Sequence, residues 1–310
     1  MTNESVSSET MTTRTMKGLG ASSAGATSGR RGRRPRTGRE RRWTRKNTIL
    51  FIVGVVIALL TIFPLAYMLL SSFKTPADVY GTSVLPKTWT FKNFVYVFTE
   101  VPFARYMLNS FLISAIITVV ALFFHSMAAY ALARLRFKGR ETIFLIIFST
   151  LLVSLPVVLI PEFEIVRLLG LLDSYGGLIV PSIFSAFGIF LLRQFYQGLP
   201  DELEEAALVD GASYWRIYWS IVLPLSRPIM AALAVFFFLA NWNSFVWPLT
   251  ITSNPNLRVV QVGISTFHQQ YASSESYIIA ASTVAAIPTL LLFFFFQKQI
   301  TESIKTSGFK

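Results

Sequence analysis

The sequence contains no cysteine and only two histidines, His125 and His268. The absence of cysteine excludes disulfides, thiolate metal sites and a cysteine nucleophile within this chain. The two histidines lie far apart in the sequence, which argues against a metal cluster built from histidine. The chemistry of the chain must therefore come from other residue types.

Charged residues are also scarce, at 14% of the chain, whereas 53% of the residues are hydrophobic and the mean hydropathy is +0.54. Several apolar runs are about twenty residues long, which is the length that crosses a bilayer as a helix. The composition therefore predicts an all-α, polytopic membrane protein. The sequence has no G-x4-G-K-[ST] loop to bind ATP phosphates, and its sparse acidic residues form no pattern typical of a catalytic site.

Basic residues are concentrated at the N-terminus. Residues 1–46 contain twelve Lys and Arg but only three Glu, which accounts for most of the net charge of +12. This segment lacks apolar periodicity and is rich in Ser, Thr and Gly, so we expect a disordered cytoplasmic tail. Basic residues beside a span favour membrane lipid, rather than nucleic acid, as the partner. A signal peptide is disfavoured because the following apolar run is too long and lacks a cleavage site.

Six apolar segments predict six transmembrane helices. Their approximate bounds are 47–73, 109–133, 142–161, 176–195, 228–249 and 277–297. Prolines inside these segments, such as Pro64, Pro156 and Pro181, are tolerated in membrane helices. We expect a transmembrane domain over residues 47–299 and a short tail over residues 300–310. An even number of spans places both termini on the same side.

The distribution of Lys and Arg predicts which side that is. With the N-terminus inside, 22 of the 28 Lys and Arg residues lie in cytoplasmic segments and six lie in outer loops. Without the N-terminal tail the ratio is still ten to six. The positive-inside rule therefore predicts that both termini are cytoplasmic.

Residues 199–228, here called the elbow, form a charged segment between the fourth and fifth predicted spans. Pro200 and Asp201 suit a helix start, because proline fits the first turn and an acid can accept free amide protons. Gly211 suits the end of that helix, since glycine readily adopts a left-handed backbone.

A second helix is expected in the elbow from Tyr214 to Val222. It is expected to stop before Leu223-Pro224, because proline disfavours helical geometry in the residue that precedes it. Periodicity alone does not distinguish this arrangement from an ordinary amphipathic loop.

The elbow also carries a specific motif. Glu205-Ala206-Ala207, Gly211 after three residues, and Ile221-Val222-Leu223-Pro224 after nine more match E-A-A-x3-G-x9-I-x-L-P, the loop of ABC importer membrane subunits. The chain resembles this permease family. The resemblance implies that the elbow forms a cytoplasmic coupling helix, which docks in a cleft of an ATP-binding subunit. It implies a coupling role for the following residues: Glu204, Glu205, Ala206, Ala207, Asp210, Gly211, Leu223 and Pro224.

The same resemblance implies a set of partners. These are a second permease subunit, two ATP-binding cassette subunits, an extracytoplasmic solute-binding protein and membrane lipid. ATP and Mg²⁺ would be bound by the partner ATPase subunits, with no cofactor in this chain. Movement of those subunits would shift the spans between outward and inward access, and a ligand shifts that equilibrium through its different affinities for the two states.

Three further segments narrow the resemblance to carbohydrate-type permeases, similar to the six-span maltose permease subunit. They are 102–110, 129–140 and 242–249. The resemblance implies a sugar importer in a bacterial plasma (inner) membrane. A permease of the same class for a non-sugar solute stays open as an alternative. A secondary transporter is a remoter alternative, because we see neither inverted repeats nor charged coupling residues within the spans.

Polar residues in the fifth predicted span are candidates for the substrate path. Asn241 and Asn243 lie close in sequence to Trp242 and Trp247, and amides beside flat aromatic faces suit a sugar. Polar groups within spans tend to face the bundle interior or a cavity. Helix–helix hydrogen bonding and interfacial anchoring by tryptophan are the alternative explanation.

Overall fold

The computed structural model describes residues 45–267 and 275–307. Most of the predicted N-terminal tail, His268 and residues 308–310 lie outside the described residues. The chain divides into two units, Met1–Gly54 and Val55–Lys310. The described part of the first unit is the beginning of helix α1, and all other described elements belong to the second unit.

Helices account for the regular secondary structure of the described ranges, which confirms the predicted all-α class. Four segments are long and apolar enough to cross a membrane, and the total is up to six if each of two bent helix pairs forms one span. The four are α1 (Arg45–Ser71), α3 (Phe103–Arg134), α6 with α7 (Tyr175–Ile183 and Ala186–Gln197) and α15 (Glu275–Ser307). Helix α15 continues beyond the predicted sixth span through most of the predicted C-terminal tail.

The third predicted span is not one straight helix. Helix α4 (Arg140–Ser149) and a short 3-10 turn (Thr150–Leu152) are followed by α5 (Leu155–Leu168), and the two parts meet at a bend of 108°. Pro156 lies in the first turn of α5, where its missing amide proton is not needed. The predicted end of the third span at residue 161 was wrong, because α5 continues to Leu168.

The fifth predicted span also differs from expectation. Helix α11 (Arg227–Trp242) ends well before residue 249, and a separate helix, α12 (Val246–Ile251), follows. At the end of α11, Asn243 Nδ2 donates to the Leu239 carbonyl at 2.9 Å. Asn243 is the C-cap residue of α11, and its backbone amide also donates to the Leu239 and Asn241 carbonyls.

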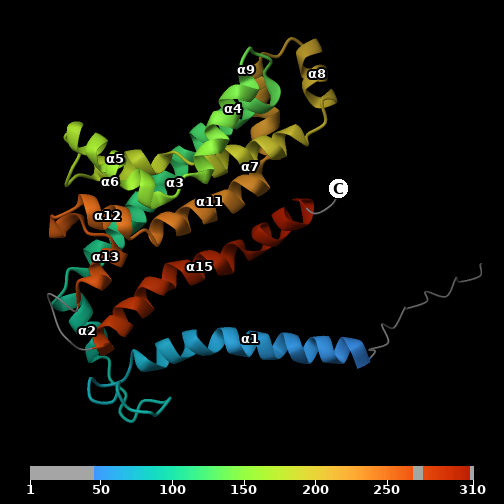
Figure 1. Cartoon of the computed structure of the whole chain (residues 1–310). Helices are drawn as coiled ribbons and strands as arrows, with labels where there is room; N and C mark the ends of the chain where they lie inside the picture. The colour runs from blue at the N-terminus through green and yellow to red at the C-terminus, as the bar shows by residue number, and fades with distance from the viewer. Residues whose placement is uncertain (1–44, 268–274, 308–310) are drawn as a thin grey trace, which may run out of the picture. The chain divides into compact units, whose positions relative to one another are not determined.

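The remaining helices are short and connect the long ones. They are α2 (Lys92–Thr99), α8 (Glu202–Val209), α9 (Tyr214–Ile217), the π-helical turn Tyr218–Val222, α10 (Leu223–Leu225), the 3-10 turn Pro255–Leu257 and α13 (Val260–Ser265). Figure 1 shows α8 and α9 together at one end of α3, whereas α13 lies toward the other end.

Helix α3 is the centre of the second unit, because it packs against α6, α7, α11 and α13. Its neighbours approach closely at Gly188 on α7, where an added Cβ would lie 2.7 Å from His125 Nδ1 and 2.5 Å from the Phe237 ring. Small residues permit such close helix packing in membranes. The packing fixes α3 between α7 and α11, the two helices that lead into and out of the elbow.

Candidate functional site

The elbow begins with α8, which ends in a Schellman motif. The Ala212 amide donates to the Ala207 carbonyl at 2.9 Å, and the Gly211 amide donates to the Leu208 carbonyl at 3.0 Å. This motif requires a left-handed backbone at the residue just after the helix end, and Gly211 at this position has a φ of +79°. The predicted role of Gly211 in ending the first helix is therefore confirmed.

The second arm of the elbow differs from the prediction. Ser213 Oγ accepts the Arg216 amide at 3.3 Å and caps α9, a role that the sequence analysis did not assign. The helix then continues past Pro224 to Leu225 instead of stopping before Leu223. A π-helical turn makes this continuation tolerable, because the Leu223 amide donates to the Tyr218 carbonyl five residues back. The turn widens the helix immediately before the proline, which has no amide proton to donate.

The surface of α8 is both acidic and apolar. No residue of α8 is buried, and Glu205 is among its exposed residues. Val209 is 88% exposed and the neighbouring Trp215 of α9 is 56% exposed. Carboxylates in the first turn are also favourable for the helix dipole. The elbow thus presents carboxylates and large apolar side chains without partners in the described part of the chain.

One arginine ties this exposed helix to the bundle. Arg134, the last residue of α3, forms an ion pair with Asp201 and donates to the Leu199 carbonyl. It also pairs with Glu204 at 3.3 Å. The expectation that Asp201 would cap α8 was wrong, because its side chain makes no cap hydrogen bond and pairs with Arg134 instead.

Burial changes the acidity of Glu204. Its side chain is only 12% exposed, and burial raises the pKa of its carboxyl above the usual value, while the Arg134 charge opposes that shift. Glu205, one residue further along α8, is exposed. The two adjacent glutamates of the motif therefore differ: Glu204 faces its own chain, and Glu205 is available to a partner.

A second buried arginine holds the turn between α3 and α4. Arg193 on α7 donates to both carboxylate oxygens of Glu141, at 2.7 and 2.9 Å, and to the Leu132 carbonyl at 3.2 Å. Its guanidinium also lies 3.8 Å from the centre of the Phe144 ring, a favourable cation–π position. The turn is thereby fixed beside the elbow.

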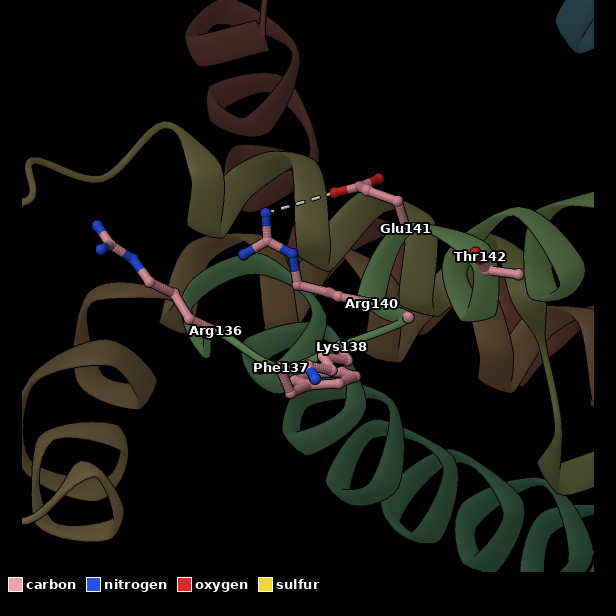
Figure 2. A pocket seen from close by; sticks show the side chains of 7 residues that line it. Arg136, Phe137, Lys138, Arg140, Glu141 and Thr142 are labelled. Carbon is pink, nitrogen blue, oxygen red and sulfur yellow. Dashed lines mark hydrogen bonds and ion pairs between the residues drawn. The ribbon is translucent and has the colours of Figure 1, made fainter.

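The turn itself forms an open hollow of about 680 Å³ lined by residues 136–142. Figure 2 shows Arg140 directed toward Glu141, with which it forms an ion pair at 3.4 Å, while Arg136 extends away from the turn. This hollow is basic and lies beside the Arg193 contact. Within the described ranges, no group of three or more His, Cys, Asp or Glu is placed to hold a metal ion.

The candidate substrate-path residues form hydrogen bonds with backbone carbonyls of the helices. Trp242 is buried, and its indole donates to the Ala285 carbonyl of α15 at 3.2 Å. Trp247 is buried and donates to the Gly177 carbonyl of α6 at 3.1 Å. Asn241 Nδ2 donates to the Phe237 carbonyl at 2.8 Å within its own helix.

Asn243 is the exposed member of this group. Its Oδ1 accepts Gln261 Nε2 from α13 at 3.2 Å. The two tryptophans thus make the helix–helix contacts that were the alternative explanation, whereas Asn243 presents a polar group at the surface. The substrate-path role of these residues stays a prediction.

Sequence reasoning did not assign the three polar side chains that hold the long helices together, Arg134, Arg193 and Asn109. Asn109 Nδ2 donates to the carbonyls of Asn256 and Arg258 at 2.9 Å each. Their position in the sequence could have pointed to them, because each is a charged or amide residue toward the end of an apolar span. Such a side chain is costly to bury without a partner. The partners are more than fifty residues away, so the sequence alone does not identify them.

The fold and the elbow define a class: a helical membrane protein in which an acidic, exposed helix is inserted between two spans. Residues 121–306 match the family described as the inner membrane component of binding-protein-dependent transport systems. The chain belongs to this family, and is thus a permease component of a transport system in a membrane.

Individual relatives agree with this assignment. The chain is 34% identical over 237 residues to an arabinooligosaccharides transport system permease protein of Halalkalibacterium halodurans, covering 75% of this chain and 85% of the relative. It is 38% identical over 224 residues to an sn-glycerol-3-phosphate transport system permease protein of Yersinia pestis, covering 70% and 79%.

A solved structure matches the fold as well. A chain of a bacterial ABC transporter involved in the import of the acidic polysaccharide alginate superposes with a TM-score of 0.74 at 26% identity. The match covers 83% of this chain and 98% of that chain. The fold of most of this chain is therefore that of a chain of an ABC transporter.

Proposed function

We propose that this chain is a membrane-spanning subunit of an ATP-driven, binding-protein-dependent sugar importer, and that the elbow couples ATP hydrolysis to transport. The observation that carries the proposal is the geometry of α8. It projects large apolar side chains and Glu205, which forms no ion pair within the described ranges, and it is joined to the bundle at Arg134. An acidic helix of this kind suits a cleft with a basic group on an ATP-binding subunit.

The proposed complex contains a second permease subunit, two ATP-binding cassette subunits and an extracytoplasmic solute-binding protein. ATP and Mg²⁺ are bound by the ATPase subunits, and this chain acts through movement rather than through catalysis. The distribution of Lys and Arg supports an orientation with the elbow and both termini in the cytoplasm of a bacterium. The segments at the opposite end of α3 then face the solute-binding protein.

Sugars are the proposed substrate class. The relatives' names specify arabinooligosaccharides and sn-glycerol-3-phosphate, and the similar structure belongs to an alginate importer. These solutes all carry hydroxyl groups, which an amide side chain can hydrogen-bond. Asn243 is the residue on the proposed path that could hydrogen-bond such a solute, because it is exposed.

Purification of the native complex with its solute-binding protein tests both parts of this proposal. We expect ATPase subunits to co-purify with the chain, and the binding protein to bind one of a panel of arabinooligosaccharides, sn-glycerol-3-phosphate and alginate oligosaccharides. A binding protein that selects amino acids or metal ions would contradict the sugar assignment. It would leave the ATP-driven mechanism in place.

Uptake by reconstituted vesicles separates this mechanism from secondary transport. We expect solute uptake to require ATP, the ATPase subunits and the loaded binding protein. Uptake by this chain alone, driven by an ion gradient, would contradict the proposal and establish a secondary transporter.

A further inference from the structure

The attachment of α8 to the bundle is concentrated at one side chain. Arg134 is 7% exposed, and it pairs with Asp201 and with Glu204 while it donates to the Leu199 carbonyl. These three partners lie just before α8 and in its first turn. The end of α3 therefore contacts α8 directly, although Arg134 and Asp201 are more than sixty residues apart in sequence.

The other connections of α8 are weak by comparison. None of its residues is buried, and Ala207 contributes only a partly buried contact to the neighbouring core. Its covalent links are a short segment after α7 and the turn at Gly211 before α9. A displaced α8 would thus pull on α3 through a charged contact as well as on its own flanking helices.

The opposite end of α3 is clamped in a similar way. Arg105 Nε donates to the Asn256 carbonyl at 3.0 Å, and Asn109 Nδ2 donates to that same carbonyl at 2.9 Å. Ser110 Oγ accepts the Val260 amide at 2.7 Å. The segment from Pro255 to Val260 is therefore fixed to the first turns of α3.

Between these two sets of contacts, α3 is suited to move as a rigid body. It is a continuous helix of 32 residues, and its sequence contains neither proline nor glycine. Arg134 lies 25 residues after Asn109, which corresponds to about 38 Å of helix. The third span is by contrast bent by 108°, and α11 meets the helix before it at a bend of 75°, so these segments are less able to carry a displacement along their length.

We propose that Arg134 is a positioning residue that makes α8 and α3 one moving body, so that displacement of the coupling helix reaches the 255–260 segment at the other end. This inference rests on the proposed function of the elbow. It assigns α3 the connection between the ATPase side and the segment proposed to face the solute-binding protein. Through α3, a loaded binding protein at that segment also acts back on α8, because coupling between two sites is reciprocal.

The first test compares variants of Arg134 in the complete transporter, reconstituted with its ATPase subunits and binding protein. For Arg134→Gln we expect the stimulation of ATP hydrolysis by the loaded binding protein to fall at least about fivefold. Arg134→Lys should restore part of it, because lysine keeps the charge but loses the fork of donors. Arg167→Gln is the matched control, since it breaks an exposed Arg–Glu pair at 2.6 Å that is remote from the elbow, and it should behave as wild type.

Wild-type stimulation in Arg134→Gln would overturn the inference and leave the proposed function intact. If the wild-type complex itself shows no stimulation by the loaded binding protein, the proposed function fails and the inference fails with it. The two failures are therefore distinguishable by the wild-type measurement.

A second test does not depend on an Arg134 variant. The chain has no cysteine, so Glu202→Cys on α8 and Leu108→Cys on α3 can carry paired spin labels. Both positions are exposed, and Glu202 lies outside the residues assigned a coupling role. We expect the distance between these labels to stay constant in the wild-type complex between the nucleotide-free state and the state trapped with ATP and vanadate. A distance that changes between the two states would overturn the inference, because α8 and α3 would then move independently.

Discussion

Gly211 connects the two arms of the elbow in a backbone conformation that other residues adopt at a cost. Its φ is +79°, and an added Cβ would meet no atom within 4 Å. The cost of Gly211→Ala is therefore one of backbone conformation, about 1 kcal/mol, and not one of steric overlap. We expect this variant to insert and assemble, but to transport several-fold more slowly at saturating ATP because α8 is presented less accurately.

Gly198 offers the matched control for that prediction. It lies at the end of α7 with a φ of −85°, and an added Cβ would stand at an ordinary 3.4 Å from the Phe195 carbonyl. Gly198→Ala should transport at the wild-type rate. Equal impairment of both variants would show that the left-handed turn at Gly211 has no particular role.

Glu204 leads to a prediction about pH. Burial raises the pKa of this carboxyl above its usual value of 4.5, against the opposing effect of Arg134. The contribution of protonated Glu204 to the free energy of unfolding is complete at a pH below the usual pKa. This contribution is lost as the pH rises through the raised pKa. Glu204→Gln, which keeps a neutral side chain, should therefore raise the unfolding temperature of the purified complex near pH 7.

That gain should disappear near pH 4, where Glu204 itself is protonated. Thermal unfolding measured across this pH range checks the prediction. In Glu204→Gln, Asp201 remains as a partner of Arg134, so the arginine is not left unpaired. A lower unfolding temperature for this variant at neutral pH would therefore contradict the prediction, and would show that the Glu204–Arg134 ion pair outweighs the cost of burying the carboxylate.

At the residue scale, the sequence predicted what depends on local order along the chain. The spacing of Glu205 and Gly211 identified the elbow, and the left-handed Gly211 followed from backbone sterics. Partners distant in sequence were beyond this reasoning, so Asp201 was predicted to cap α8 when it pairs with Arg134. The sequence likewise did not identify the Ala285 carbonyl as the partner of the Trp242 indole.

At the element scale, Arg193 on α7 secures the turn between α3 and α4. Arg193→Gln removes its donors to Glu141 and its position over Phe144. Because Glu141 is 59% exposed and can be hydrated, we expect a loss of about 2 kcal/mol in the free energy of unfolding. Denaturation of the variant complex measures this loss.

The same variant separates stability from coupling. Arg193→Gln should retain the wild-type ratio of stimulated to unstimulated ATP hydrolysis, since Arg193 does not touch α8. A collapse of that ratio without a loss of stability would contradict the structural role assigned to Arg193.

The positions of the helices were more predictable than their continuity. Long apolar runs located all six segments, because crossing a bilayer requires a certain length of apolar helix. Hydropathy does not indicate the direction of the helix axis, so the bends before α5 and before α11 were not predicted. The continuation through Pro224 was also missed, since a π-helical turn depends on the surrounding packing and leaves no periodic signal.

At the scale of the whole molecule, the predicted orientation can be measured without background, because the chain has no cysteine. Tyr80→Cys and Phe137→Cys lie at positions that are 71% and 43% exposed. A membrane-impermeant maleimide should label Tyr80→Cys in intact spheroplasts and Phe137→Cys only after permeabilisation. The reverse pattern would contradict the orientation drawn from the positive-inside rule.

We propose that α8 couples ATP hydrolysis to transport through Glu205. The most direct measurement is the number of solutes taken up per ATP hydrolysed by the reconstituted complex, compared between Glu205→Lys and Glu202→Lys. Both variants reverse an exposed charge on the same helix, so their effects on folding should be similar. The account predicts that Glu205→Lys lowers this ratio at least about fivefold while Glu202→Lys keeps it, and equal ratios for Glu205→Lys and wild type would contradict it.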